Sequence, residues 1–256
     1  MSIRERVWII ATVAVVLALA GCGAAPIPDD EIAGMVGSST ALAGGDTAAL
    51  SIFAGGPPTS SAKGFNVSTT IDFPGIGSLT YDYAIDYLED GSSVADPVSL
   101  PWDEVTFDGS AHLVVDLPNY EADRTLDVDF EVTEFDDDSN DGRVVVNGAS
   151  TAAGTATWTN PTTDATAGYT TDLTKTWTDV NIADPTNPAL PFYPTSGTIA
   201  VAGSIERHHE GPSGYRNGRW SGTVTITFDS DATASVDVNG SSYQLNLVTG
   251  EVIPGT

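Results

Sequence analysis

An acidic stretch between two runs of β-forming residues holds side chains of the type that binds calcium. Asp137, Ser139 and Asp141 occupy positions one, three and five of a calcium-binding loop. Position twelve, which requires a bidentate glutamate, is Gly148, and both flanking segments alternate as strands do. This pattern disfavours the helix-loop-helix calcium motif. It leaves open a looser calcium site in a β-hairpin beside a simple solvated turn, and the candidate oxygen donors are Asp136, Asp137, Asp138 and Asp141.

A second group of potential metal ligands lies in the segment SIERHHEG. If this segment is extended, Glu206, His208 and Glu210 point to one side. Arg207 and His209 then point to the other. Two carboxylates and one imidazole could bind zinc, but a further ligand would have to come from elsewhere in the chain. We therefore interpret the segment as the polar end of a strand.

The motifs of common hydrolases and nucleotide-binding proteins are absent from the sequence. Ser60 and Lys63 have the spacing of a serine-lysine pair, but the other segments that accompany such a catalytic pair do not follow. The two residues also lie in a linker of small residues. We predict that the protein is not an enzyme.

Aromatic side chains gather on one side of the segment LTYDYAIDY. Tyr81, Tyr83 and Tyr87 alternate with polar residues and share their side with Leu79 and Ile85. An exposed face of this kind could stack on sugars or line a pocket for a lipid. We favour the alternative that it is part of the core, because a sheet has to bury one of its faces.

The N-terminal residues have the layout of an export signal. Arg4 and Arg6 precede an apolar run of 14 residues, from Val7 to Ala20. As a helix this run would be about 21 Å long, which is too short for the ~30 Å hydrocarbon core of a bilayer. The run therefore indicates a cleaved signal peptide and not a permanent membrane span.

The junction Leu19-Ala20-Gly21-Cys22 resembles the lipobox of bacterial lipoproteins. The resemblance covers these four residues and the segment before them. It implies cleavage before Cys22, a thioether-linked diacylglycerol on this cysteine, and anchoring to a bilayer that the protein does not span. Cys22 is the only cysteine of the chain, so it has no cysteine partner for a disulfide within the chain. Gly23, in place of aspartate, implies the outer membrane if the host has two membranes, and the outer face of the plasma membrane if it has one.

The chain is strongly acidic, with a formal net charge of −26 from 35 acidic and 9 basic residues. This magnitude is far above the roughly 2 to 8 of a typical small soluble domain. Such a field repels nucleic acid and anionic lipid head groups, so we expect no nucleic-acid partner. Three interpretations remain: a solvated acidic surface, which we favour, divalent cations as partners, or a basic protein partner. We expect no cofactor, with calcium as the one alternative left open.

The spacing of apolar residues predicts a short helical segment that is followed by a long strand-rich segment. Ile32 and Val36 have helical spacing, and Asp46 is placed to cap a second helix. This pattern predicts one or two weak helices between about Asp29 and Phe53, weakened by several glycines.

From Phe65 onward, apolar and polar residues alternate, as in LDVDFEV and RWSGTVTITF. One side of each strand is thus apolar and the other polar, which is typical of antiparallel strands and not of buried parallel ones. We predict an all-β fold, a large antiparallel meander that forms a β-sandwich or a partly open β-barrel, with a short N-terminal helical segment.

Two stretches of the strand-rich part resemble each other. TFDGSAHLVVDL, from Thr106 to Leu117, and TFDSDATASVDV, from Thr227 to Val238, agree at 6 of 12 positions. VVVNG and VDVNG, which begin at Val144 and Val236, recur as well. We predict that each unit is a strand, an aspartate-rich turn and a returning strand, and both an old duplication and repeated use of one hairpin design remain open.

The predicted organisation is a signal peptide (1–21), a tether (22–28), a short helical segment (29–56), a linker (57–64) and a β-rich domain (65–256). A lipobox, a short helical segment and many hairpins together resemble uncharacterised β-rich envelope lipoproteins of bacteria. The resemblance implies fold and location and transfers no active site. We predict a membrane-anchored envelope lipoprotein with a non-catalytic binding or structural β domain. The alternatives are a carrier of a lipophilic or glycan ligand and a calcium-stabilised surface adhesin.

Overall fold

The computed structural model describes residues 27–38, 65–95, 101–133, 143–183, 193–211, 214–229 and 231–255. Over these ranges the chain forms one helix, α2 (Asp29–Ser38), and a succession of strands. The strands are β1 (Phe65–Phe73), β2 (Gly77–Glu89), β3 (Ser92–Ser93), β4 (Glu104–Leu117), β5 (Tyr120–Thr133), β6 (Arg143–Thr159), β7 (Thr166–Ala183), β8 (Ser196–Gly211), β9 (Gly214–Phe228), β10 (Thr233–Val238), β11 (Ser241–Asn246) and β12 (Val252–Pro254).

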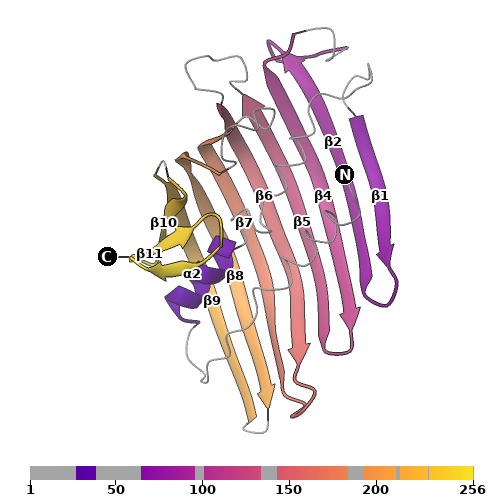
Figure 1. Ribbon diagram of the computed structural model, residues 1–256, viewed down its shortest axis with the longest axis vertical. Helices are drawn as coiled ribbons and strands as arrows, with labels where there is room; N and C mark the ends of the chain where they lie inside the picture. The colour runs from indigo at the N-terminus through magenta and orange to yellow at the C-terminus, as the bar shows by residue number, and fades with distance from the viewer. Residues whose placement is uncertain are drawn as a thin grey trace.

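All strands belong to one antiparallel sheet. The sheet has 12 strands, and their order follows the sequence from β1 to β12, with the short β3 paired to the end of β2. Figure 1 shows the long strands side by side in a single twisted layer, with β1 at one edge and the C-terminal strands at the other. The predicted all-β antiparallel meander is confirmed, and it takes the form of one open sheet that does not close into a barrel.

Strict alternation gives the sheet two different faces. In β4, Phe107 is 3% exposed, whereas the next residue, Asp108, is exposed. The cross-strand register carries this pattern across the sheet, since Phe107 lies opposite Ile85 of β2 and Phe130 of β5, which are buried as well. We call the face that carries Phe107 the inner face and the opposite one the outer face.

Helix α2 lies over the C-terminal part of the inner face, where it contacts β9 to β12 (Figure 1). Ile32 and Val36 of α2 face the sheet and are fully buried, as their helical spacing predicted. Gly37 allows a close approach to the sheet, because a side-chain carbon at this position would lie 3.0 Å from Leu245 Cδ1. Burial of each large aliphatic side chain here stabilises the docked helix by about 1.5 to 3 kcal/mol.

The sequence of α2 explains where the helix begins. Its first turn carries Asp29, Asp30 and Glu31, and negative charge is favourable at a helix N-terminus. The helix predicted from Asp29 is confirmed as far as Ser38. The remainder of the predicted helical segment, with Asp46, lies outside the described residues.

The predicted hairpin repeat is wrong for its first copy. Thr227 to Val238 ends β9 and returns as β10, and Asp231 Oδ1 accepts hydrogen bonds from the backbone N–H and the hydroxyl of Thr233. The other copy, Thr106 to Leu117, lies entirely within the single strand β4. Gly109 lies inside this strand, where a side-chain carbon would be 2.7 Å from Tyr83 Cβ. Close packing between two strands, and not a turn, accounts for this glycine.

The recurring VNG tripeptide diverges in the same way. Asn239 and Gly240, with φ angles of 53° and 86°, form the two-residue turn between β10 and β11. Asn147 and Gly148 lie instead inside β6, where the register against β7 shifts. There the glycine belongs to a β-bulge. The same tripeptide therefore forms a turn in one place and lies within a strand in the other.

Candidate functional site

Several of the predicted site residues lie outside the described residues. They are the lipid-attachment residue Cys22, the pair Ser60 and Lys63, and the acidic residues Asp136, Asp137, Asp138 and Asp141. Strands β5 and β6 end and begin on either side of the acidic stretch and pair antiparallel, so the predicted hairpin connection is confirmed. Lipidation at Cys22 and calcium binding by the acidic stretch remain predictions.

The row of Glu206, His208 and Glu210 lies on the outer face of β8, as the alternation predicted. Glu206 forms an exposed ion pair with Arg219 of β9, with Oε1 and Nε 3.5 Å apart. Among the residues that the structure describes, no three histidine, cysteine, aspartate or glutamate side chains form a group that could hold a metal ion. The structure thus favours the interpretation of this segment as a polar strand end.

Three polar residues on the inner side of the sheet connect helix α2 to β7 and β8, and we call them the helix latch: Glu31 of α2, Tyr169 of β7 and Arg207 of β8. Arg207 Nη1 donates a hydrogen bond to Glu31 Oε2 at 2.7 Å, and the Tyr169 hydroxyl donates to Glu31 Oε1 at 2.9 Å. The side chains of Arg207 and Glu31 are 10% and 15% exposed. Burial, followed by the hydrogen bond to Glu31, raises the pKa of Tyr169 to about 12.

A second carboxylate in the first turn of α2 binds the next part of the sheet. Asp29 accepts hydrogen bonds from the side-chain amide of Asn239 at 3.1 Å and from the hydroxyl of Ser241 at 3.0 Å. Asn239 belongs to the turn between β10 and β11, and Ser241 follows it as the first residue of β11. The first helical turn therefore contacts the sheet at two separate points, on β7 and β8 through the helix latch and on the β10–β11 turn through Asp29.

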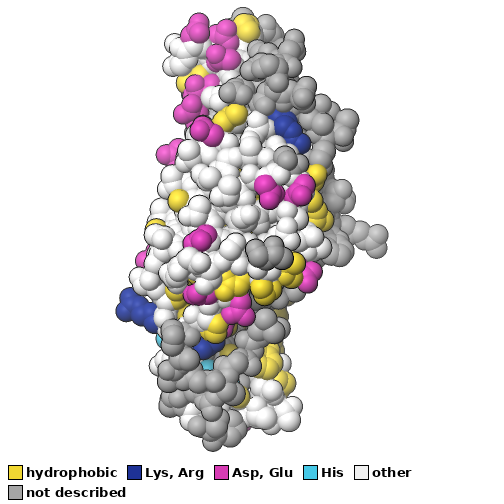
Figure 2. All heavy atoms as spheres, turned by 90° about the vertical axis from the view of Figure 1, so that its left-hand side faces the viewer, with side chains coloured by type: hydrophobic (Ala, Val, Ile, Leu, Met, Phe, Trp, Pro, Cys, Tyr) yellow, Lys and Arg dark blue, Asp and Glu magenta, His cyan; other side chains and the backbone are white. Residues whose placement is uncertain are grey.

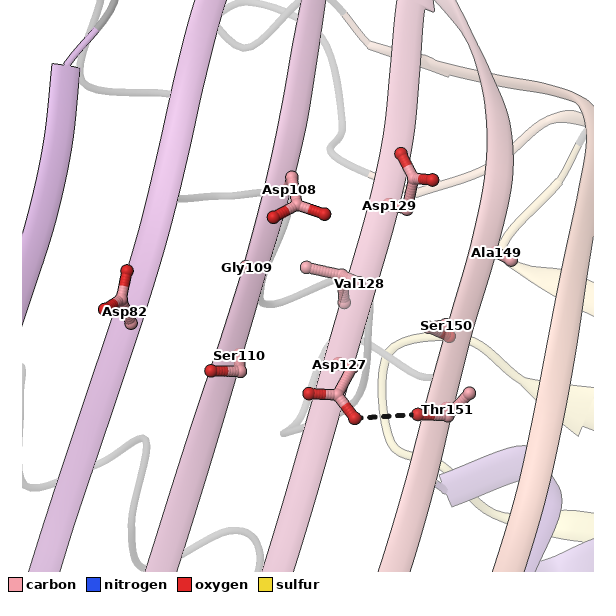
Figure 3. A pocket seen from close by; sticks show the side chains of 10 residues that line it. All are labelled: Asp82, Asp108, Gly109, Ser110, Asp127, Val128, Asp129, Ala149, Ser150 and Thr151. Carbon is pink, nitrogen blue, oxygen red and sulfur yellow. Dashed lines mark hydrogen bonds between the residues drawn. The ribbon is translucent and has the colours of Figure 1, made fainter.

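A shallow depression of about 400 Å³ lies on the outer face, over β2, β4, β5 and β6. Figure 3 shows the side chains that line it. Asp82, Ser110, Asp127 and Thr151 form one row across the four strands. Within this row the Thr151 hydroxyl donates a hydrogen bond to Asp127 Oδ2 at 3.1 Å (Figure 3). We call this region the acidic depression.

Like charges face each other in the acidic depression. Asp108 of β4 lies directly opposite Asp129 of β5, a cross-strand arrangement that is destabilising for carboxylates. The repulsion between carboxylates extends along these strands to Glu104. Burial is the largest cause that raises the pKa of Glu104, and the neighbouring carboxylates of Glu131 and Asp103 raise it further. The described basic side chain closest in sequence on this face is His112, whose Nε2 lies 2.8 Å from Asp123 Oδ1. The depression presents many oxygen atoms but no closed coordination shell.

The outer face of β6 to β9 has a different character. Exposed threonines repeat along it: Thr151, Thr155 and Thr157 on β6, Thr174, Thr176 and Thr178 on β7, and Thr223, Thr225 and Thr227 on β9. Figure 2 views the molecule from the side of its C-terminal strands, where uncharged surface prevails and acidic side chains are scattered. The negative charge of the described outer face is thus concentrated on β2, β4 and β5.

The predicted aromatic face is largely core. Tyr87 is 6% exposed and packs edge-on against Trp102, with ring centroids 5.1 Å apart. Tyr83 packs against Phe107 at 5.7 Å and stacks with Tyr81 at the same centroid distance. Tyr81 and Tyr83 are half-buried, so the favoured interpretation as core is supported for Tyr87 and in part for the other two tyrosines.

The helix latch is not predicted by the sequence pattern. Glu31 and Arg207 are 176 positions apart, and nothing in either segment predicts their pairing. One signal was available, because Arg207 occupies the same face of β8 as the buried Ile205 and interrupts an otherwise apolar pattern. A buried arginine requires a carboxylate or other acceptor, and the acidic first turn of a predicted helix is a natural source.

Over the described residues, the fold and surface define a class: an antiparallel β protein built on one open sheet, with a helix on its inner face and acidic strands on its outer face. Comparisons of the chain with protein-family models, with curated proteins and with solved structures found no match. Within the described ranges, no helix combines the length and apolar character that crossing a bilayer requires.

Proposed function

We propose that the chain is a lipoprotein of the bacterial cell envelope, anchored through an acylated Cys22, whose β-sheet is a non-catalytic structural or binding domain. The observation that carries the proposal is the junction Leu19-Ala20-Gly21-Cys22 behind Arg4, Arg6 and 14 apolar residues. If the host has two membranes, Gly23 after the cysteine favours the outer one. The anchor is a bilayer, and the proposal needs no nucleic-acid partner.

The position of helix α2 supports a short link between anchor and sheet. Ile27 is 3% exposed, and it follows Cys22 by five residues. Even fully extended, five residues span at most about 18 Å. An acylated Cys22 would therefore hold the sheet close to the bilayer surface, with α2 and its latch as the first folded element.

The packed central part of the inner face favours a surface module over a carrier. Phe130, Trp177 and Ile199 are at most 2% exposed, so this part of the apolar face is packed and does not line an open pocket. The acidic depression is shallow and open and is lined by four aspartates, which suits contact with a cationic group or a basic protein surface better than enclosure of a lipid. A lipophilic ligand would require an enclosed apolar space between elements.

The anchoring proposal is tested by replacing Cys22 with alanine or serine in a bacterial host. The unaltered chain should incorporate an alkyne-labelled fatty acid and stay with washed membranes, whereas both variants should lose the label. Replacement of Ser2 is the matched control and should change neither result. Full labelling of the Cys22→Ala variant would refute lipidation at this residue.

A calcium-stabilised surface adhesin is the second candidate, favoured by the opposed carboxylates Asp108 and Asp129. Calcium that binds only the folded protein must raise its melting temperature. We expect a rise at millimolar calcium beyond that produced by matched ionic strength. Asp108→Asn with Asp129→Asn would abolish the rise if the depression binds the ion, and Asp137→Asn with Asp141→Asn would abolish it if the β5–β6 connection does. No rise at all rejects this candidate.

A further inference from the structure

The two edge strands of the open sheet differ in how well they are protected against pairing with a strand of another molecule. The C-terminal edge strand, β12, has three residues, ends at Pro254 and contacts α2. Short length, proline and cover by another element all block pairing with a foreign strand. The opposite edge strand, β1, has nine residues, FNVSTTIDF, and contains no proline, glycine or lysine. Its register against β2 runs without a shift from Phe65 to Phe73.

The β1 edge is also accessible. Asn66, Ser68 and Thr70 on its outer face are exposed, and Thr69 and Ile71 on its inner face are half-buried. Within the described part of the chain, β1 pairs with β2 alone. A long, regular and exposed edge presents unpaired backbone N–H and C=O groups, which makes it a template for a further strand.

We propose that β1 pairs antiparallel with β1 of a second copy of this chain, so that the two sheets continue across a two-fold axis. The sequence of β1 is self-complementary about Thr69. In the register centred there, Thr69 lies opposite its own copy, and Ser68 lies opposite Thr70. Asn66 lies opposite Asp72, so the amide can donate a hydrogen bond to the carboxylate and no carboxylate faces another.

Full overlap selects this register over its neighbours. A register centred on Thr69 pairs the whole of β1 from Phe65 to Phe73, whereas a shift by two positions leaves residues at both ends unpaired. A shift by one position would set inner-face residues against outer-face residues and break the common curvature of the two sheets. A two-fold axis perpendicular to the sheet also keeps both outer faces on the same side.

The acidic outer faces make this association dependent on salt. The nearest carboxylates of the two copies are Asp72 on β1 of one copy and Asp82 and Asp86 on β2 of the other, because Asn66 opposite Asp72 pairs with Ala84 of β2. Two strand spacings and two residues along the strand separate them by about 12 Å. This distance exceeds the Debye length of ~8 Å at physiological ionic strength but not the ~30 Å at 0.01 M. The dimer should therefore form at physiological salt and dissociate at low salt, the opposite of an association driven by charge attraction.

Cysteine cross-linking in membranes of the expressing host tests the register with the full chain. Directly opposed residues have Cα atoms about 4.5 to 5.5 Å apart, which suits a disulfide. Thr69→Cys should therefore form dimers under mild oxidation. Asn66→Cys alone should not, because the two copies of residue 66 lie about 20 Å apart along the strands. Cells that express both the Asn66→Cys and the Asp72→Cys chains should form the mixed dimer.

Controls separate this pairing from random collision and from the native cysteine. The unaltered chain, with Cys22 alone, shows any background from that thiol. Thr225→Cys, on the outer face of β9 away from the edge, is a more exposed strand position than Thr69 and therefore sets a stringent level for random collision. Equal cross-linking at residues 69 and 225, or equal cross-linking of Asn66→Cys with and without Asp72→Cys, would overturn the proposal.

A charge-complementation experiment gives a second readout without cysteine. Thr69→Lys places two ammonium groups across the two-fold axis and should lower dimerisation of the detergent-purified full chain by about tenfold in sedimentation at 0.15 M salt. A mixture of Thr69→Lys and Thr69→Glu chains should restore it. Monomers at every salt concentration for the unaltered chain would refute the pairing. This result would leave the lipid anchor untouched, because the pairing does not rest on it.

Discussion

The two ends of the sheet bury their inner faces to different extents. At the C-terminal end, α2 lies over the strands, and Ile226, Val236 and Leu245 are fully buried. At the β1 end, Ile71 and Leu79 of the same inner face are only half-buried. The residue types are equally apolar, and α2 supplies a covering layer over β9 to β12 at the C-terminal end. Burial is not limited to that end, since Phe107 on β4 is buried as well, so the poorly covered part of the inner face lies next to the β1 edge.

The outer faces differ at the same two ends. Carboxylates crowd the outer face of β2, β4 and β5, whereas threonines repeat on that of β6, β7 and β9. The acidic strands are those next to the accessible edge strand β1. Negative charge keeps such an edge from pairing indiscriminately with other acidic chains. The comparison suggests that the C-terminal end is stabilised by packing, while the β1 end is kept soluble by charge.

The largest expected effect is the loss of helix docking. Ile32→Asp places a carboxylate at a fully buried position of α2 without a partner. We expect a loss of about 3 to 5 kcal/mol in the free energy of unfolding. Urea unfolding followed by tryptophan fluorescence measures it.

The matched change at the other end is Ile71→Asp. Because Ile71 is half-buried on the edge strand, we expect a loss of about 1 kcal/mol or less. Losses of similar size for the two variants would contradict the distinction between a covered end and an open end.

The next effect comes from the helix latch. Arg207→Met leaves the carboxylate of Glu31 mostly buried without its cation, and we expect a loss of about 2 to 4 kcal/mol. Arg219→Met removes the exposed partner of Glu206 and should cost about 0.5 kcal/mol or less. The double variant Glu31→Gln with Arg207→Met should lose less than the sum of its single variants. An additive result would show that the two side chains do not stabilise each other.

The latch also predicts a dependence on alkaline pH. The pKa of Tyr169 is raised from 10.0 to about 12 in the folded protein, so folding favours the protonated phenol. Its contribution to stability is fully present below pH 10 and is lost as the pH rises toward about 12. Tyr169→Phe cannot ionise and should be less sensitive in this window. The measurement is the difference in unfolding free energy between the two proteins at several pH values, which cancels the other tyrosines; a constant difference would contradict the prediction.

Much of the fold was predictable because the pattern of each strand is local. LDVDFEV specifies a half-buried strand by itself, and β5 is one. The spacing of Ile32 and Val36 likewise specified a helix. Whether the meander stays open depends on whether β1 meets β12, and no local pattern encodes an encounter between the two ends of the chain. Gly109 was misinterpreted for the same reason, since its neighbour Tyr83 lies on another strand.

The surface sites were less predictable than the strands. Asp108 and Asp129 occupy polar positions that the alternation assigns to the outer face. Their opposition follows from the register that the turn at Pro118 and Asn119 sets between β4 and β5. A change of one residue in that turn would alter which carboxylates meet. Pairings of this kind, like that of the helix latch, require the register of distant strands.

The smallest expected effect tests charge at the acidic end. Asp108→Asn removes one of two carboxylates that face each other across β4 and β5. We expect this variant to be more stable than the unaltered protein by about 0.2 to 1 kcal/mol at low ionic strength. The gain should shrink at high salt, because exposed charges are then screened. Urea unfolding at two salt concentrations measures both effects.

The matched change at the other end is Asp172→Asn on the outer face of β7. Asp172 lies opposite Ala153 and Ser204, neither of which is charged. Its replacement relieves no direct repulsion, so its effect should be smaller than that of Asp108→Asn and should vary less with salt. Equal gains would mean that the total charge of the chain, and not the opposition of two carboxylates in the acidic depression, limits the stability of this end. In that case the carboxylates on β2, β4 and β5 would affect the solubility of the protein and not the stability of these strands.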